Sequence, residues 1–232
     1  MNNRKEINEA QANEMFPNIM ETLKDTEKIL NNVYPVAVKT LDRYEGIKEL
    51  LYDAHDGYYV VYKIVIDEGE TTASAAISKK LIKATNTTED EIKQHAWYNL
   101  TEMINTTAIC KSMTSVLQEL MPGAEELVEL PDGDMMQILR LKNGTFQMSG
   151  ILGNFELLRD TVFKMFPMAD KVIILPSSIW EFILIPIEKS QPSVITENLT
   201  SIVEEVNGTE VDPNEQVADN AFLLTRHELQ YI

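Results

Sequence analysis

Residues 171–187, KVIILPSSIWEFILIPI, are the most strongly patterned stretch of the chain. Two apolar runs rich in Val, Ile and Leu flank Pro176, Ser177 and Ser178, and such runs are typical of buried β-strands. Proline fixes φ and serine hydroxyls bond to nearby backbone, so the centre predicts a turn. The second run makes both faces of its strand apolar: Phe182 and Leu184 on one face, Ile183, Ile185 and Ile187 on the other. We therefore expect a buried hairpin whose two faces must both be covered.

Other segments carry hairpin signals. The run YYVVYKIVI over residues 58–66 is apolar on both faces apart from Lys63, and we expect it to pair with residues 72–77. Asn143-Gly144 is the preferred pair for a two-residue turn, which predicts strands on both of its sides. The last apolar segment, residues 221–232, predicts one or two terminal strands.

Helices are expected between these hairpins. Thr88 and Glu91 have the spacing of a capping box, which satisfies free backbone amides where a helix begins. Asn154 and Thr196 are the expected caps of two later helices, and Asn207-Gly208 is the expected end of the second. Cys110, the single cysteine, falls between two expected helices, and we interpret it as a small buried hydrophobe rather than a reactive thiol.

Hairpins separated by helices favour an α+β fold. We expect an antiparallel sheet built from successive hairpins, with helices packed mainly on one face. Residues 1–32 are expected to form an N-terminal helical arm and residues 33–232 the α+β domain. Residues 3–31 of the arm are the candidate segment for formation of a homo-oligomer.

Charge limits the partners of this chain. Its 37 acidic and 20 basic side chains give a net charge of −17, which repels nucleic acid phosphates and anionic lipid. We therefore expect a protein partner, with no nucleic acid bound by direct phosphate contact and no membrane. The polar first residues lack the apolar segment of a secretory signal, and the single cysteine suits a reducing compartment, so a soluble cytoplasmic protein is expected.

Catalytic and cofactor motifs are scarce. Ser177 and Ser178 lack the glycines of a nucleophile elbow, and the chain has no P-loop and no dinucleotide fingerprint, so no cofactor is expected. No metal is expected either, because HExxH and CxxC motifs are missing. Glu181 stands beside Trp180 at the mouth of an apolar strand, where burial raises the pKa of a carboxyl group. Glu181 and His95 are therefore the candidate catalytic residues, with pairing of Glu181 to a lysine as the alternative.

Three segments resemble a known family: VIILPSSIWEFILIPI, SIVEEVNGTEV and VADNAFLLTR. They are similar to the C-terminal half of a family of uncharacterised proteins from Gram-positive bacteria, their mobile elements and phages. The family pattern is ILPSSIHE-like, and this chain has Trp180 where the family has histidine, so an acid–base role at that position does not apply here. YYVVYKIVI and SMTSVLQEL match further upstream, and the resemblance covers roughly residues 33–230. The resemblance implies a mobile element or phage as the setting of the protein, and it implies no biochemical activity.

These observations favour a non-enzymatic protein that binds or regulates another protein, as a factor of a mobile element or phage. Two alternatives stay open. One is a hydrolase-type enzyme that uses carboxylates, Glu181 among them, together with a histidine. The other is an acidic mimic of DNA, which requires carboxylates clustered in a stripe.

Overall fold

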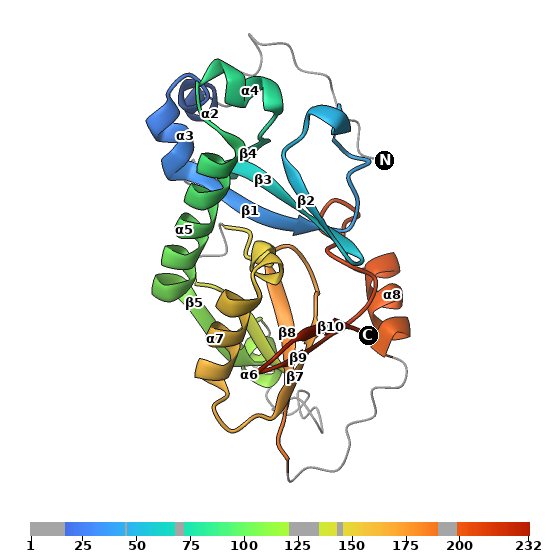
Figure 1. The fold of residues 1–232 in the computed structure, drawn as a ribbon. Helices are drawn as coiled ribbons and strands as arrows, with labels where there is room; N and C mark the ends of the chain where they lie inside the picture. Colours follow the sequence, from blue (N-terminus) through green and yellow to red (C-terminus); the bar gives the residue numbers. More distant parts are fainter. Residues whose placement is uncertain (1–16, 45, 68–71, 121–134, 143–145, 190–198) are drawn as a thin grey trace.

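The computed structural model describes residues 17–44, 46–67, 72–120, 135–142, 146–189 and 199–232 of the chain. These residues form two antiparallel β-sheets with helices around them (Figure 1). One hydrophobic core runs through both sheets, since Val61 of the first and Phe182 of the second belong to the same cluster of buried side chains. The predicted α+β class with antiparallel pairing is confirmed, and its strands are divided between two sheets.

The first sheet has four strands: β1 (Val33–Val38), β2 (Tyr52–His55), β3 (Tyr58–Asp67) and β4 (Thr72–Ala76). β3 is central, with β1 on one side and both β2 and β4 on the other. Strands β2 and β4 meet end to end because Leu51 N–H donates to Ile77 O and Ile77 N–H donates to Tyr62 O. The predicted pairing of residues 58–66 with 72–77 is confirmed.

The second sheet has six strands in the order β10-β9-β7-β8-β6-β5. Their bounds are β5 (Ala108–Ser112), β6 (Gln137–Leu141), β7 (Lys171–Leu175), β8 (Glu181–Ile187), β9 (Phe222–Thr225) and β10 (Leu229–Tyr231). β7 and β8 form the predicted hairpin, with Ile173 opposite Ile185. Phe182 joins the main core, whereas Ile185 joins a second cluster that includes Val203. Both faces of the hairpin are covered, as the alternation predicted.

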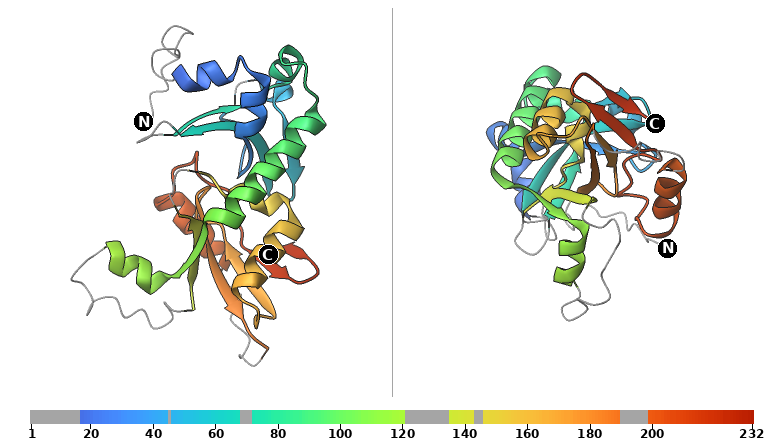
Figure 2. Two further views of the ribbon diagram at one scale, coloured as in Figure 1. Left: turned by 90° about the vertical axis from the view of Figure 1, so that its left-hand side faces the viewer. Right: turned by 90° about the horizontal axis from the view of Figure 1, so that it is seen from below.

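The longer helices are α5 (Glu89–Thr107), α6 (Met113–Leu120), α7 (Phe155–Met165) and α8 (Leu199–Thr209), and α4 (Lys79–Ala84) is short. α5 runs alongside both sheets and leads directly into β5 (Figure 2). Its predicted capping box is present: the Thr88 hydroxyl accepts from Glu91 N–H, and the Glu91 carboxylate accepts from Thr88 N–H. Asn154 caps α7, as expected. The expected cap Thr196 lies outside the described residues.

Two short helices precede β1: α2 (Pro17–Thr22) and α3 (Thr26–Asn32). Ile29 of α3 is fully buried in the main core. The Asn99 side chain of α5 donates to Leu30 O at 2.8 Å and to Val33 O at 3.0 Å, which fastens α3 to α5. Residues 1–16 lie outside the described part, so the arm as a unit and its self-association stay predictions.

The expected turn at Asn143-Gly144 lies outside the described residues, and the strand expected after it was a wrong prediction. β6 pairs with β5 and β8, and a 3₁₀ helix, η3 (Ser149–Gly153), stands where its hairpin partner was expected. Tertiary contacts decide this conformation: the Ser149 hydroxyl donates to Ala37 O at 2.9 Å, and a Cβ on Gly150 would collide with the Pro35 carbonyl. Strand β5, which contains Cys110, was missed, and α8 extends past Asn207 to Thr209.

Candidate functional site

The Pro-Ser-Ser segment forms the turn of the β7–β8 hairpin. The Ser177 hydroxyl donates to Glu181 O at 3.2 Å, and the Ser178 hydroxyl accepts from Trp180 N–H at 3.1 Å. Ser178 N–H also donates to Glu181 O. The two hydroxyl groups therefore bond to backbone within the turn, and Glu181 takes part through its carbonyl group.

The same turn ties the two sheets together. Ser149 N–H donates to Ile179 O, and Ile179 N–H donates to Glu215 O. The Trp180 indole N–H donates to a Glu215 carboxylate oxygen at 3.1 Å. Trp180 thus holds the segment before β9, and the hydrogen bonds of the turn give it a structural role.

The loop after α8 completes this junction. Lys39, just after β1, donates its backbone N–H to Gln216 O and forms an ion pair with Asp219 at 2.6 Å. The Gln216 amide group donates to Asn207 O at 2.6 Å, and the buried Asn207 amide group donates to Ala218 O at 2.8 Å. Asn207 is thus a buried anchor for this loop, which explains why α8 does not end there.

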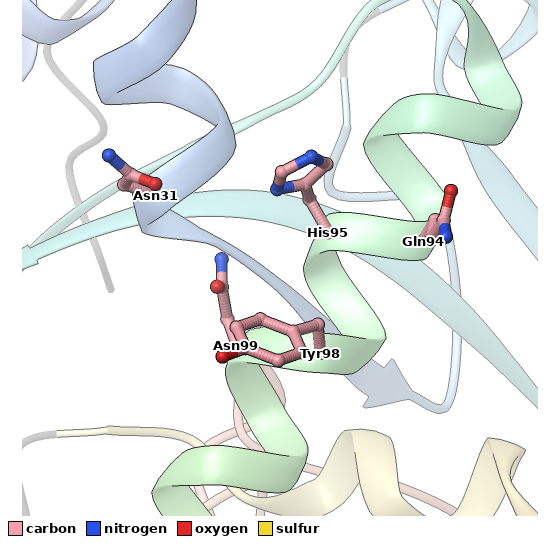
Figure 3. A pocket seen from close by; sticks show the side chains of 5 residues that line it. All are labelled: Asn31, Gln94, His95, Tyr98 and Asn99. Carbon is pink, nitrogen blue, oxygen red and sulfur yellow. The ribbon is translucent and has the colours of Figure 1, made fainter.

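His95 lies on the exposed side of α5, in a pocket of about 360 Å³ that we call the α3–α5 pocket. Its lining residues are Asn31, Gln94, His95, Tyr98 and Asn99 (Figure 3). Tyr98 is 64% exposed, so most of its side chain is accessible to a partner. The Asn99 amide group already donates to the backbone of Leu30 and Val33. The side chains that remain for contact with a ligand are those of Asn31, Gln94, His95 and Tyr98.

The two candidate catalytic residues belong to different sites. His95 lines the α3–α5 pocket, and Glu181 makes no contribution to that lining. Glu181 opens β8 in the six-stranded sheet, where its cross-strand neighbour is Arg140. The catalytic pairing of Glu181 with His95 stays a prediction. The alternative, pairing of Glu181 with a lysine, stays a prediction as well.

A second hollow, about 660 Å³ in volume, lies over the first sheet. We call it the Lys63 hollow, and its lining includes Arg43, Tyr44, Glu49, Ala76, Ser78 and Lys80. Lys63 of β3 lies directly opposite Ala76 of β4, and residues that face each other across antiparallel strands share a face of the sheet. The Lys63 amine also lies 5.8 Å from the centre of the Tyr44 ring. Lys63 therefore lies on the same face of the sheet as this hollow, although it is not among the residues that line it.

Lys63 has an unusual environment for a lysine. Only 6% of it is exposed, and its amine donates to the Gln147 side-chain oxygen at 3.3 Å. Burial, together with the positive charge of Arg43, lowers the pKa of Lys63 to about 7. In the sequence, Lys63 is the one interruption of an apolar strand. This interruption was the signal of its unusual environment, although no function was predicted from it.

The opposite face of β3 carries a polar cluster that fastens α5. Asp53 accepts from the Tyr62 hydroxyl at 2.6 Å and from the Lys93 amine at 2.5 Å. Burial acts to raise the pKa of Asp53, but the hydrogen bonds from Lys93 and Tyr62 outweigh it and leave the pKa below its usual value. Burial and the Asp53 charge raise the pKa of Tyr62 strongly, so Tyr62 keeps its proton and acts as a donor.

Other reactive groups are few in the described part of the chain. Cys110 is half-buried, and burial raises the pKa of its thiol to about 11, which favours the unreactive thiol form. Among the described residues, His, Cys, Asp and Glu side chains do not gather in threes as a metal ion would require. Within the same ranges, each helix is too short or too polar to cross a membrane.

The fold and its two hollows define an acidic, antiparallel α+β protein with one recess between α3 and α5 and another over the four-stranded sheet. The chain belongs to a family of unknown function, DUF5688, whose pattern matches residues 3–226. The predicted membership in a family without assigned activity is thereby confirmed. No curated protein and no solved structure matches the chain.

Proposed function

We propose that this protein acts without catalysis, by binding a basic segment of another protein on the face formed by α3 and α5. The observation that carries the proposal is Tyr98, an exposed aromatic side chain that lines the α3–α5 pocket among polar side chains. Tyrosine is among the residues that contribute most binding energy in protein interfaces. Its hydroxyl and ring can accept a hydrogen bond and a cation, respectively.

The charges around the pocket favour a basic partner. Glu102 follows Tyr98 by four residues, so the two side chains lie on one face of α5. Glu27 has the same spacing to Asn31 on α3, and both glutamates are exposed. Together with the net charge of −17, this surface attracts lysine and arginine side chains.

A paired pull-down from host lysate tests this proposal. We expect the wild-type chain to enrich a partner that Tyr98→Asp loses, with an affinity at least about 30-fold weaker for the variant, since truncation of a central tyrosine costs about 2 kcal/mol or more. The control is Met168→Asp, which changes another exposed apolar side chain, 76% exposed, on the segment between α7 and β7. Equal enrichment by both variants, or repeated failure to enrich a partner, would contradict the proposal.

The setting and the assembly state belong to the same proposal. The family resemblance supports a mobile element or phage as the setting of this binding protein, and the single cysteine supports a cytoplasmic location. Self-association through residues 3–31 is tested by removing residues 1–16 and measuring mass by light scattering. The deletion stops at residue 16 because Ile29 of α3 fills the main core, and a longer deletion would also unfold the sheet.

A further inference from the structure

The polar side chains of the α3–α5 pocket are uncommitted. Within the described part of the chain, four of its lining side chains form neither a hydrogen bond nor an ion pair: those of Asn31, Gln94, His95 and Tyr98. The Asn99 amide nitrogen donates to the backbone of α3 and β1, and among the same residues its side-chain oxygen has no donor. The pocket thus offers a ligand several free polar groups around one exposed aromatic ring.

The free oxygens of this pocket belong to neutral groups. The carboxamide oxygens of Asn31, Gln94 and Asn99 are hydrogen-bond acceptors. The described lining contains no carboxylate, and the exposed Glu27 and Glu102 lie one helical turn away on α3 and α5. Such a pocket attracts a cation from a distance and then requires it to bind through neutral acceptors and an aromatic ring.

An arginine side chain meets this requirement better than a lysine side chain. The guanidinium group is planar and more weakly hydrated than an ammonium group, and it stacks on aromatic rings while its fork of N–H groups donates to neighbouring oxygens. The lysine ammonium group is a compact, strongly hydrated charge, so its desolvation is compensated best by a carboxylate. The chemistry of the pocket therefore distinguishes between the two basic side chains.

The same arrangement occurs within this molecule. The guanidinium carbon of Arg226 lies 4.4 Å from the centre of the Phe163 ring, and its terminal N–H donates to the Pro167 carbonyl oxygen at 3.0 Å. In the described ranges this guanidinium group has no carboxylate partner. The Tyr98 ring differs in one respect, because among the described residues no cation of this chain lies over it. An arginine from another protein can take that place.

We propose that the α3–α5 pocket binds an arginine side chain of the partner, with the guanidinium group on the Tyr98 ring and its N–H groups donating to the carboxamide oxygens of Asn31 and Asn99. These residues belong to two helices, Asn31 to α3 and the other two to α5 (Figure 3), so the bound side chain contacts both. The inference rests on the proposed function, because it names the side chain through which a basic segment is bound.

Three capped tripeptides serve as probes on the full chain: Gly-Arg-Gly, Gly-Lys-Gly and Gly-citrulline-Gly, in which citrulline is the neutral isostere of arginine. An NMR titration at constant ionic strength follows the ring signals of Tyr98 and His95. We expect the arginine peptide to bind about fivefold more tightly than either of the others, since an exposed cation–π contact corresponds to a factor of roughly 2–5 and the guanidinium fork adds hydrogen bonds.

The outcomes separate this inference from the proposed function. Equal affinities for the arginine and lysine peptides, both above that of the citrulline peptide, overturn the choice of arginine and leave the binding of a basic segment intact. An equal affinity for the citrulline peptide, or unchanged ring signals with all three peptides, overturns both.

Three variants locate the bound guanidinium group. Tyr98→Leu should weaken the arginine peptide about fivefold through loss of the ring, and Asn31→Ala about threefold through loss of one hydrogen bond. The control is Asn105→Ala, which alters an exposed asparagine of α5 outside the lining and should leave the affinity unchanged. All three side chains are exposed, so each variant should fold as the wild type does. An unchanged affinity in Tyr98→Leu, followed through the His95 signals, overturns the proposal.

Discussion

The centres of the two sheets are built from different kinds of side chain. In the six-stranded sheet, β7 and β8 are apolar on both faces, and Ile174, Phe182 and Leu184 have no exposed surface. In the four-stranded sheet, the central strand β3 carries Lys63 on one face and Tyr62, bonded to Asp53, on the other. The first arrangement fills an interior, and the second adds polar groups whose burial lowers stability unless each is compensated.

This difference indicates where function lies. The hairpin of β7 and β8 is the more prominent feature of the sequence, but its serines and its tryptophan form hydrogen bonds within the turn and to the loop before β9. Both hollows of interest adjoin the four-stranded sheet and the helices that cover it. The proposed binding surface thus belongs to the part of the molecule around the sheet with polar residues in its centre, and we interpret the apolar sheet as the scaffold.

The largest effect should come from the apolar centre. Phe182→Ala removes a fully buried ring from the main core and should lower the free energy of unfolding by about 4 kcal/mol, as aromatic truncations in cores do. The loss should not depend on pH between about 5 and 9, since no charge is involved. Urea denaturation at three pH values measures both quantities. A loss below about 1.5 kcal/mol would show that the hairpin is not in a filled interior.

Lys63→Met should raise the free energy of unfolding, the opposite of the effect of Phe182→Ala. At about pH 6 the wild-type chain buries an ammonium group that the variant lacks, so the variant should be more stable by about 3 kcal/mol. This value is below the limit of about 5 kcal/mol that corresponds to a lowering of the Lys63 pKa from 10.5 to about 7. Methionine fills similar volume, which limits packing losses.

The pH dependence distinguishes this cause from simple packing. Between about pH 7 and 10.5 the unfolded wild-type chain holds a proton that the folded chain has lost, so wild-type stability relative to the variant rises with pH. The advantage of Lys63→Met should therefore shrink across this window and vanish above it. A variant less stable than wild type at pH 6 would mean that the folded protein compensates the Lys63 charge.

The sequence predicts local features better than distant contacts. The start of α5 could be predicted because Thr88 and Glu91 form their capping box within four residues, and the β7–β8 hairpin because its apolar pattern is continuous. β5 was missed because AICKS shows no alternation and becomes a strand by pairing with β6. η3 depends on contacts with Ala37 and Pro35, over a hundred residues earlier.

The same limit applies to the sites. His95 was chosen from the sequence, but its pocket exists because Asn99 binds the backbone of α3, 66 and 69 residues away. Lys63 was visible as a polar residue in an apolar run, yet its bond to Gln147 spans 84 residues. A sequence shows which polar residue interrupts an apolar run. Whether the buried charge of that residue is compensated depends on partners that the fold brings together.

The polar cluster under α5 should respond to acid. The pKa of Asp53 is lowered in the folded state, so its contribution to stability is present at neutral pH and is lost as the pH falls through the folded value, below 3.8. Asp53→Asn should cost about 1 kcal/mol at pH 7, because the side chain is 37% exposed and solvent weakens its ion pair with Lys93. The difference from wild type should disappear at about pH 2. Asp42→Asn, which alters an exposed carboxylate, should change stability little at either pH.

The smallest effects should come from the turn that dominates the sequence. Ser177→Ala and Ser178→Ala each remove one hydrogen bond to backbone in a partly exposed turn, so each should cost less than about 1 kcal/mol. Neither substitution should alter partner enrichment, since both hydroxyl groups bond within the turn. A variant of normal stability that loses partner enrichment would place the turn in a functional site. The apolar sheet would then be more than a scaffold, and the contrast between the two sheets would no longer hold.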